Sequence, residues 1–345
     1  MNRLKFICLK SGRVVLWTLP WTCTLLFFGW SAGAIYCLEF LPRLVSVPLA
    51  LIYSVAGFGM LVRMQNRKIW LRVAWAAVLV IYAFHLLQRP SNDRPWAEDN
   101  ARLVEVDIRD GHVHIDALRH SVYRTETDYD VHYRNYDFSL EQLDKVWFVV
   151  QRFTALEGIA HNFLTFRVQT DTGPEYFSVS AEIRREHGET FSPLKGLYRQ
   201  YELIYILADE RDEIGARTVV RPDDRVFMYP VNASPAQVQQ LFREIAVRLT
   251  QLRTRPEFYH SLLNNCTNNI VLHTYPLTPE PINWLDPRIV APGFADRFAF
   301  ATGLIGEPGQ RFTELRQKCR IDAIARQVGF ADDFSARIRS AQSSF

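Results

Sequence analysis

Three long apolar stretches near the N-terminus constrain this chain more than any other feature of its sequence. They cover Val14 to Leu38, Leu44 to Val62 and Ile69 to Leu87, and the last is interrupted early by Arg72. Each is close to the roughly 20 residues that a helix needs to cross ~30 Å of hydrocarbon. A soluble helix would show polar positions at a 3.6-residue period, whereas these stretches are apolar on every side. The sequence therefore predicts three transmembrane helices, over about residues 14–38, 44–62 and 69–87.

Positive charges beside these stretches predict how the helices are oriented, because short loops rich in lysine and arginine stay in the cytoplasm. The first connection offers only Arg43. The cations before the first stretch and around the second connection are Arg3, Lys5, Lys10, Arg13, Arg63, Arg67, Lys68 and Arg72. We therefore expect a multi-pass protein of the bacterial inner membrane, with a cytoplasmic N-terminus and a periplasmic C-terminal domain. If the first stretch is instead a signal peptide cleaved near Ser31 to Ala34, the rest of the chain still lies on that side.

The remainder of the chain has the composition of an ordinary globular domain. We divide the chain into a membrane anchor at residues 1–90, a periplasmic domain at 91–275 and a C-terminal helical extension of the same domain at 276–345. The part beyond the anchor is large enough to bury its own core. The formal net charge of +3 comes partly from membrane-flanking cations, and no basic run with interleaved aromatic residues occurs. Nucleic acid is therefore not an expected partner.

Alternating apolar and polar residues predict strands through the first half of the periplasmic domain. The pattern "LVEVDIRDGHVHIDALRH" lies on both sides of Asp110-Gly111, a dipeptide that favours a tight hairpin turn. "KVWFVVQRF", "GIAHNFLTFRV", "EYFSVSAEI" and "QYELIYILAD" extend it. Helices follow: Ser234-Pro235 resembles an N-cap and first helical position, "TNNIVLHTY" suits a short helix, and "RFTELRQKCRIDAIARQV" reads as helical. The predicted fold is α+β, an antiparallel sheet packed on helices.

Two of the predicted strands can be paired by arithmetic. "HNFLTFRV" and "EYFSVSAEI" are joined by a turn-rich link centred near Thr172, so an antiparallel hairpin places His161 opposite a residue close to Ile183. Side chains alternate along a strand, which puts His161 and Glu182 on one face at neighbouring positions. A slip of two residues would bring Ser180 or Arg184 in place of Glu182.

Cys266, in the segment "SLLNNCTNNI", has three possible roles. In the periplasm it could form a disulfide with Cys319, the other cysteine of the exported part. It could be an inert buried thiol, although the four asparagines around it make a poor apolar pocket. It could also be a nucleophile, because a helix that starts here would lower the pKa of the thiol. Asn265 and nearby main-chain N–H groups would then face a developing oxyanion.

Three histidines are candidates for the general base that such a thiol needs. His273 lies seven residues along the same helix, about 10.5 Å away, which is too far for a hydrogen bond. His260 is close in sequence but has no evident orienting group. His161 has Glu182 beside it, which is the base-and-orienter arrangement of nucleophilic catalysis.

A metal site is not expected. His112 and His114 share a strand face, with His120 after them, but no carboxylate or thiol stands at a useful spacing in the sequence to complete a zinc site. No cofactor is predicted either.

Several motifs of the chain together resemble the family called the Lnb N-terminal periplasmic domain. They are "IAHNFLTFRV", "SVSAEIRREHGETFSPLKGLYRQYELIYILADERDEIGARTVVR" and "RPEFYHSLLNNCTNNI", in that order, and "DALRHSVYRTETDYDVHYRNYDFSLEQL" resembles the family's opening. The resemblance implies a permuted NlpC-like or papain-like thiol fold, with the histidine first and the cysteine last. It places the family's catalytic residues on His161, Glu182 and Cys266, and we add Asn265 and Ser180 as supporting or oxyanion residues. Arg184 and Glu210 to Asp212 also match, with no role assigned.

The resemblance implies a lipoprotein N-acyltransferase, a thiol enzyme of the Cys-His type. Cys266 would take an acyl chain from a phospholipid donor, and the chain would pass to an amine such as the N-terminus of an apolipoprotein. Two departures leave the acceptor open: the membrane helices precede the periplasmic domain instead of following it, and the "R-N-F" motif of the family's opening reads "RHS" at Arg119 to Ser121. A hydrolase, in particular an NlpC-like cell-wall amidase or peptidase, and a non-enzymatic membrane-tethered envelope protein remain alternatives.

Overall fold

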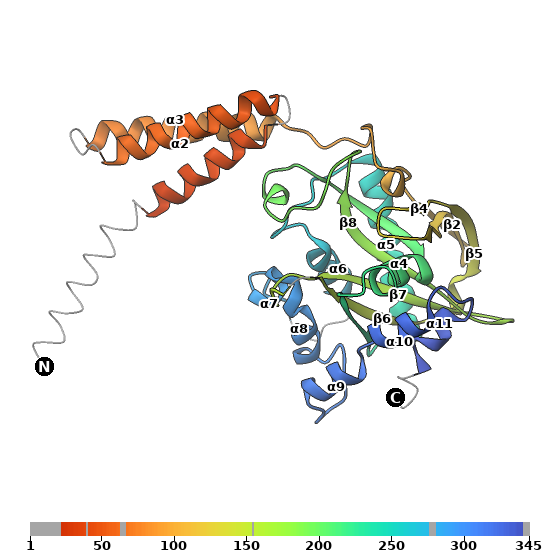
Figure 1. Ribbon diagram of the computed structural model, residues 1–345. Helices are drawn as coiled ribbons and strands as arrows, with labels where there is room; N and C mark the ends of the chain where they lie inside the picture. Colours follow the sequence, from red (N-terminus) through yellow and green to blue (C-terminus); the bar gives the residue numbers. More distant parts are fainter. Residues whose placement is uncertain (1–21, 39–40, 63–66, 154, 276–280, 341–345) are drawn as a thin grey trace, which may run out of the picture. The chain divides into compact units, whose positions relative to one another are not determined.

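The computed structural model describes residues 22–38, 41–62, 67–153, 155–275 and 281–340. The chain forms two compact units (Figure 1). The first comprises Met1–Pro90 together with Pro193–Gln200, and the second comprises Ser91–Ser192 and Tyr201–Phe345.

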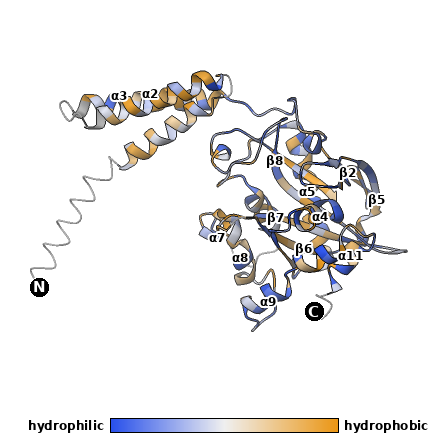
Figure 2. Cartoon of the chain, viewed as in Figure 1, coloured by the Kyte–Doolittle hydropathy of each residue, from blue (hydrophilic) through white to orange (hydrophobic). Residues whose placement is uncertain are grey.

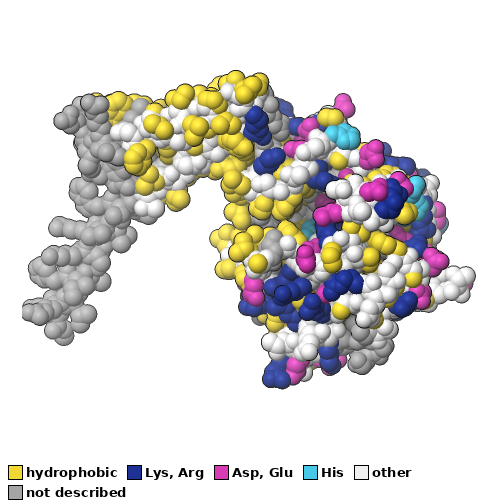
Figure 3. All heavy atoms as spheres, in the orientation of Figure 1, with side chains coloured by type: hydrophobic (Ala, Val, Ile, Leu, Met, Phe, Trp, Pro, Cys, Tyr) yellow, Lys and Arg dark blue, Asp and Glu magenta, His cyan; other side chains and the backbone are white. Residues whose placement is uncertain are grey.

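The first unit is built from apolar helices. A helix over Thr22–Tyr36 is followed by α2 (Arg43–Val62) and α3 (Arg67–Leu87). All are coloured mainly hydrophobic in Figure 2, and hydrophobic side chains cover much of their visible surface in Figure 3. Within the described residues, Ile69–Leu87 is long and apolar enough to cross a membrane, while Thr22–Tyr36 and Arg43–Gly59 are shorter apolar helices. The prediction of three transmembrane helices is therefore not confirmed, and residues 14–21 of the first predicted span lie outside the described part of the chain.

A short segment from the middle of the sequence packs on these helices. Tyr198 lies against Ala34 and Cys37, and the side-chain Nε2 of Gln200 donates to the carbonyl of Cys37 at 2.7 Å. Gly33 permits this contact, since a Cβ at that position would come within 2.2 Å of the Tyr198 hydroxyl. Pro193–Gln200, which the sequence places between two strands of the periplasmic domain, thus belongs to the helical unit.

The second unit is organised around one sheet of eight strands in the order β1-β2-β9-β8-β7-β6-β10, with β5 also paired to β2. Its pairs are antiparallel except for a single parallel contact between β2 and β9. The strands are β1 (Glu105–Arg109), β2 (His112–Arg119), β5 (Tyr133–Ser139), β6 (Leu143–Arg152), β7 (His161–Thr170), β8 (Gly173–Arg184), β9 (Glu202–Asp209) and β10 (Arg225–Pro230); β3 (Val122–Tyr123) and β4 (Tyr129–Asp130) form a separate pair. The antiparallel sheet of the predicted α+β fold is confirmed.

Helices cover both faces of this sheet. The described helices of the unit are α4 (Glu210–Thr218), α5 (Pro235–Thr254), α6 (Cys266–Thr274), α7 (Pro287–Val290), α8 (Ala295–Ala301), α9 (Phe312–Lys318), α10 (Asp322–Val328) and α11 (Phe334–Arg337), with short 3-10 turns at Glu98–Asn100, Leu140–Gln142 and Pro292–Phe294. The 3-10 turn at Lys195–Leu197 belongs to the first unit. On one face, α5 packs Phe242 against Phe166 and Phe177 in the larger core. On the other, α4 and α10 pack against Phe163 and Met228 in a second core.

The predicted β7–β8 hairpin is confirmed, with a register one residue from the predicted one. Leu164 pairs with Val179 and Thr165 with Ser178, so the same register extended to the end of β7 aligns His161 with Glu182 instead of Ile183. Partners in an antiparallel pair point to the same face, which is what brings His161 and Glu182 together. The β1–β2 turn at Asp110-Gly111 is confirmed as well, with both residues at positive φ, 51° and 81°.

The predicted start of α5 is confirmed by a capping box in which Ser234 and Gln237 exchange side-chain and backbone hydrogen bonds. The segment "RFTELRQKCRIDAIARQV" is helical as predicted, and it forms two helices, since α9 ends at Lys318 and α10 begins at Asp322. Between them the chain hydrogen-bonds to β10, with the Met228 N–H donating to the Cys319 carbonyl at 2.8 Å. These bonds to the edge strand replace those of a continuous helix.

Candidate active site

The first residue of α6 is Cys266, as the sequence predicts. Asn265 is the N-cap: its side-chain oxygen accepts from the Asn268 N–H at 3.0 Å, and the Asn268 side chain accepts from the Asn265 N–H at 3.1 Å. This reciprocal pair fixes where the helix begins. It places a thiol that is only 2 % exposed among the free N–H groups of the first turn.

His161, the first residue of β7, lies beside this thiol and is held from its other side by β8. Its Nε2 lies 2.7 Å from Ser180 Oγ and 3.5 Å from Glu182 Oε1. Ser180 donates to Glu182 Oε1 at 3.0 Å, so its oxygen is left to accept from the imidazole. The ring also stacks on Phe163, with centroids 5.8 Å apart. The structure therefore brings His161, Glu182 and Cys266 together and inserts Ser180 between the histidine and the glutamate.

The thiol and the imidazole shift each other's pKa in opposite directions. Burial alone would lower the pKa of His161, but its hydrogen bond and ion pair with Cys266, together with Glu182, raise that pKa to about 9. Burial alone would raise the pKa of Cys266, but the hydrogen bond and charge of His161 lower it, helped by the backbone of Asn162 and the hydroxyl of Thr267. The two groups thus favour a thiolate–imidazolium pair.

Behind Glu182, a buried arginine from α4 holds the carboxylate in its ionised form. The Arg217 guanidinium donates to Glu182 Oε1 at 2.6 Å and lies 2.9 Å from Glu213 Oε1. Burial disfavours the charged carboxylate, but Arg217 and then His161 hold the pKa of Glu182 well below its usual range. Glu213 shares the same cation and is fully buried, and burial raises its pKa to about 7.

A further set of ion pairs involves Glu210 and Asp212, which lie in the segment that matched the family without a role. Arg119 forms a bidentate salt bridge with Asp212, in which Nε donates to Oδ2 at 2.9 Å and Nη2 donates to Oδ1 at 2.8 Å. The Ser121 N–H donates to the same carboxylate at 2.8 Å. Glu210 pairs with Arg339 at 2.7 Å. The segments "ERD" and "RHS" therefore contact each other through charges that are almost fully buried, and they anchor α4 behind the histidine.

The ligand atoms of His161, Glu182 and Glu213 lie within 4.8 Å of one another, which is close enough for a metal ion. Arg217 already places a positive charge against both carboxylates of this group. A cation there would have to compete with the buried guanidinium, so the donor set does not fit a metal.

The two residues predicted as supporting or oxyanion residues, Asn265 and Ser180, both make side-chain contacts within the site. The side chain of Asn265 is used on both sides, since its Oδ1 caps α6 and its Nδ2 donates to the Ser261 carbonyl at 2.8 Å. Ser180 faces His161 and Glu182 and is hydrogen-bonded to both. The sequence reasoning missed Asn162 and Thr267, whose side chains are joined at 2.7 Å, and Arg217. The strand alternation could have flagged Asn162 as the buried neighbour of His161, but nothing in the sequence pairs α4 with β8.

The remaining histidines lie elsewhere. His273 is hydrogen-bonded to the Tyr205 hydroxyl at 2.8 Å, and burial lowers its pKa to about 4. His112 and His114 both contact Asp137, at 3.2 and 2.7 Å, so the prediction that no carboxylate joins them is wrong. The carboxylate comes from β5, which pairs with β2 and places Asp137 opposite His114.

Cys319, the proposed disulfide partner of Cys266, is a free buried thiol, as is Cys266. It lies in the larger core, and burial raises its pKa to about 12. The two cysteines therefore have different surroundings, since Cys266 lies beside an imidazole and Cys319 among apolar side chains.

Comparison with known proteins identifies the domain that holds this site. Residues 129–285 match the family model of the Lnb N-terminal periplasmic domain. No curated protein and no solved structure shows significant similarity to the chain. The matched residues include the strand of His161, the strand of Glu182 and the helix of Cys266. The family whose model matches these residues is the one that the sequence motifs resemble.

Proposed function

We propose that this protein is a membrane-anchored periplasmic cysteine acyltransferase. Cys266 takes an acyl chain from a phospholipid as a thioester and passes it to an amine, such as the N-terminus of an apolipoprotein. The observation that carries the proposal is the buried Cys266–His161 pair, with the thiol at a helix N-terminus and the imidazole held by Ser180 and Glu182. A thiol with a lowered pKa beside an oriented base is the arrangement that covalent acyl transfer requires.

In the first step the thiolate of Cys266 attacks the carbonyl carbon of a phospholipid ester. A C–S bond forms, the ester C–O bond breaks, and the leaving glycerol oxygen takes its proton from the His161 imidazolium. Because Nε2 faces Ser180 and Glu182, Nδ1 is the nitrogen left for the thiol and the leaving oxygen. The products are a thioester on Cys266 and a lysophospholipid.

In the second step the acceptor amine attacks the thioester carbon. The C–S bond breaks, the neutral imidazole of His161 accepts a proton from the amine, and the thiolate–imidazolium pair is restored. The N–H groups of the first turn of α6 are the donors for the oxyanion in both steps. Glu182, kept ionised by Arg217, stabilises the imidazolium that the first step consumes and the second regenerates.

The arrangement of the whole chain supports a substrate in the membrane. We infer three membrane spans, a cytoplasmic N-terminus and a periplasmic catalytic domain, from the apolar stretches, the flanking cations and the family match. Large apolar side chains are also exposed on both sides of Cys266 along the sequence: Leu262, Leu263, Leu272, Tyr275, Trp284 and Leu285. Exposed apolar side chains in the segments that flank the thiol favour a lipid over a polar cell-wall glycopeptide.

Vesicles containing phosphatidylglycerol and a diacylglyceryl-cysteine lipopeptide, reconstituted with the full chain, test this function. The proposal expects lysophospholipid and N-acylated lipopeptide in equal amounts, and neither product with Cys266→Ala. Free fatty acid in place of N-acylated lipopeptide would identify a hydrolase. Cleavage of cell-wall peptides with no lipid turnover would identify an NlpC-like amidase of permuted order, and no turnover of either substrate would favour a non-enzymatic envelope protein.

A further inference from the structure

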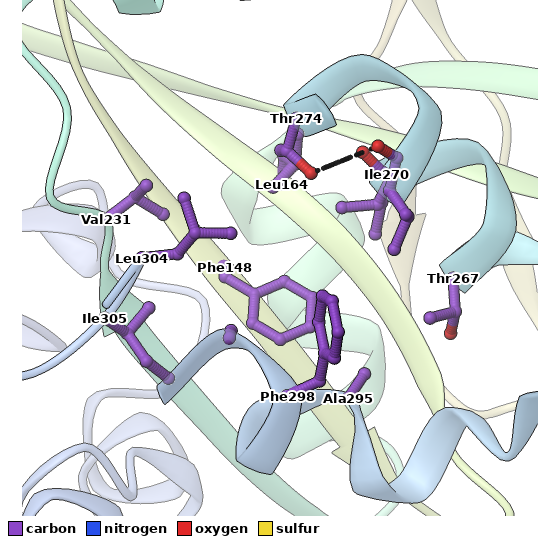
Figure 4. A pocket seen from close by; sticks show the side chains of 12 residues that line it. Phe148, Leu164, Val231, Thr267, Ile270, Thr274, Ala295, Phe298, Leu304 and Ile305 are labelled. Atoms are coloured by element: carbon purple, nitrogen blue, oxygen red, sulfur yellow. Dashed lines mark hydrogen bonds between the residues drawn. The ribbon is translucent and has the colours of Figure 1, made fainter. Parts of the chain in front are cut away.

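A cavity of about 40 Å³ lies along one face of α6 (Figure 4). α6 contributes Thr267, Ile270, Val271 and Thr274, whose spacing of three and four residues puts them on one face of the helix. The facing wall includes Phe148 from β6, Leu164 from β7 and Phe298 from α8.

The lining of this cavity offers nothing to a polar ligand. Its residues carry no charge, and both of its hydroxyl groups already have partners within the protein. Thr274 donates to the Ile270 carbonyl at 2.9 Å, the bond drawn in Figure 4, and Thr267 accepts from the Asn162 side chain at 2.7 Å. A cavity of more than roughly 10–15 Å³ has room for a water molecule, but one lined by satisfied and apolar groups stays dry. Its occupant must therefore be apolar.

The cavity starts beside the nucleophile. Thr267 follows Cys266 in the chain, and its Oγ1 is 4.0 Å from the Cys266 sulfur. From Thr267 to Thr274 the lining follows α6 for seven residues, which is about 10 Å along the helix axis. An unbranched chain attached at the sulfur could follow this face for two turns, whereas a single amino-acid side chain would reach only its beginning.

We propose that this cavity binds the acyl chain that the phospholipid donor transfers to Cys266. The assignment rests on the proposed function and adds the site that selects the chain. The observed volume corresponds to about three water-sized groups at ~10–15 Å³ each, so a long chain must extend from the cavity or widen it. Cavity size should therefore set the preferred chain length.

Two substitutions in the cavity wall test this proposal in opposite directions. Ala299→Leu fills the cavity and Leu304→Ala enlarges it, since both residues line it and are buried. Ala301→Leu is the matched control, because it makes the same change at an exposed position of the same helix, α8. Each full-length variant is reconstituted in nanodiscs with an equimolar mixture of dioctanoyl-, dimyristoyl- and dioleoyl-phosphatidylglycerol. Intact mass gives the ratio of the acyl adducts, and the rate at which iodoacetamide labels Cys266 reports an intact site.

The proposal expects Ala299→Leu to reduce the dioleoyl-derived adduct about tenfold relative to the dioctanoyl-derived one, because one extra methylene in an apolar pocket discriminates by at least that factor. Leu304→Ala should shift the ratio toward the longer chains, and Ala301→Leu should match the wild type. Unchanged ratios in both cavity variants, with normal labelling of Cys266, would overturn the cavity assignment and leave the proposed function standing. A wild-type protein that forms no acyl adduct would contradict both the cavity assignment and the proposed function. If an apolar peptide slows the iodoacetamide labelling of Cys266 in the wild type but not in Ala299→Leu, the cavity binds a peptide side chain instead of an acyl chain.

Discussion

At the scale of single residues, the pKa of the Cys266 thiol depends on His161. The thiol is buried, and burial by itself would keep it protonated and inert. Because the pKa of His161 is raised, the imidazolium contributes its full stabilisation of the folded state below pH 6.5, the ordinary histidine pKa. This stabilisation is lost as the pH rises through about 9. The lowered pKa of Cys266 means that the thiolate forms as the pH rises through a value below 9.0. The thiolate–imidazolium pair is therefore favoured at pH values between the pKa of Cys266 and the pKa of His161.

The first prediction concerns the alkylation of Cys266. In the wild type the rate should rise with a midpoint below the ordinary thiol pKa of 9.0, because the imidazolium stabilises the thiolate. In His161→Ala the midpoint should move to 9.0 or above, because burial remains and the partner is gone. Iodoacetamide labelling of each cysteine against pH, followed by mass spectrometry, measures both, and buried Cys319 is the internal control. Equal midpoints in the two proteins would show that the pair does not form.

The second prediction concerns Ser180, the link between His161 and Glu182. Ser180→Ala removes both of its hydrogen bonds and leaves the imidazole 3.5 Å from the carboxylate, so acylation should slow about tenfold with KM unchanged. Ser180→Thr should restore most of the rate. Ser178→Ala is the control, because Ser178 is buried on the same face of β8 and its hydroxyl has no partner among the described residues. A rise in KM without a fall in kcat would show that Ser180 contacts the substrate instead.

At the scale of elements, the site is assembled from the ends of a strand and a helix. The sequence could predict the hairpin, because a turn signal and two alternating strands fix which residues share a face. It could also predict the start of α6, because an asparagine cap is a local signal. It could not predict that α4 packs behind β8, since the buried pairs of Arg119 with Asp212 and of Arg217 with Glu182 join segments that are distant in the chain.

The third prediction separates capping by Asn265 from a role in the oxyanion site. Asn265→Ala should reduce the free energy of unfolding by about 1 kcal/mol, and Asn265→Ser should retain most of the cap, because serine caps about as well as asparagine and stays uncharged at this buried position. Acylation should also be retained in Asn265→Ser. Ser234→Ala, which removes the cap of α5, should cost a similar free energy without changing the reactivity of Cys266. A folded Asn265→Ser variant that acylates about a hundredfold more slowly would instead identify the amide as an oxyanion donor.

The fourth prediction concerns Arg217 on α4. Arg217→Met leaves Glu182 and Glu213 buried against each other without their cation, so we expect a loss of about 3–5 kcal/mol in the free energy of unfolding. Arg217→Met combined with Glu213→Gln removes one of the two charges and should recover a large part of that loss. Thermal unfolding of the wild type, the single variant and the double variant at neutral pH measures this. A double variant no more stable than the single one would contradict the shared ion pair.

At the scale of the whole molecule, the chain joins apolar helices to a globular domain that holds Cys266, His161 and Glu182. The sequence could predict both parts, because each follows from local composition and periodicity. It could not predict that Pro193–Gln200 packs with the helices, since that depends on contacts of Tyr198 and Gln200 with residues more than 160 positions away in the chain. The sequence could not predict the cavity beside Cys266 either, because its wall combines five segments of the sequence.

The fifth prediction tests the central claim, that Cys266 carries the acyl group. The full-length protein is incubated with phosphatidylglycerol in nanodiscs and its intact mass is measured before and after treatment with hydroxylamine. We predict a gain equal to one acyl chain that hydroxylamine removes, that maps to Cys266 and that is absent in Cys266→Ala. A reduced, folded protein with an alkylatable Cys266 that gains no such mass, or that carries the acyl chain on another residue, would contradict the account.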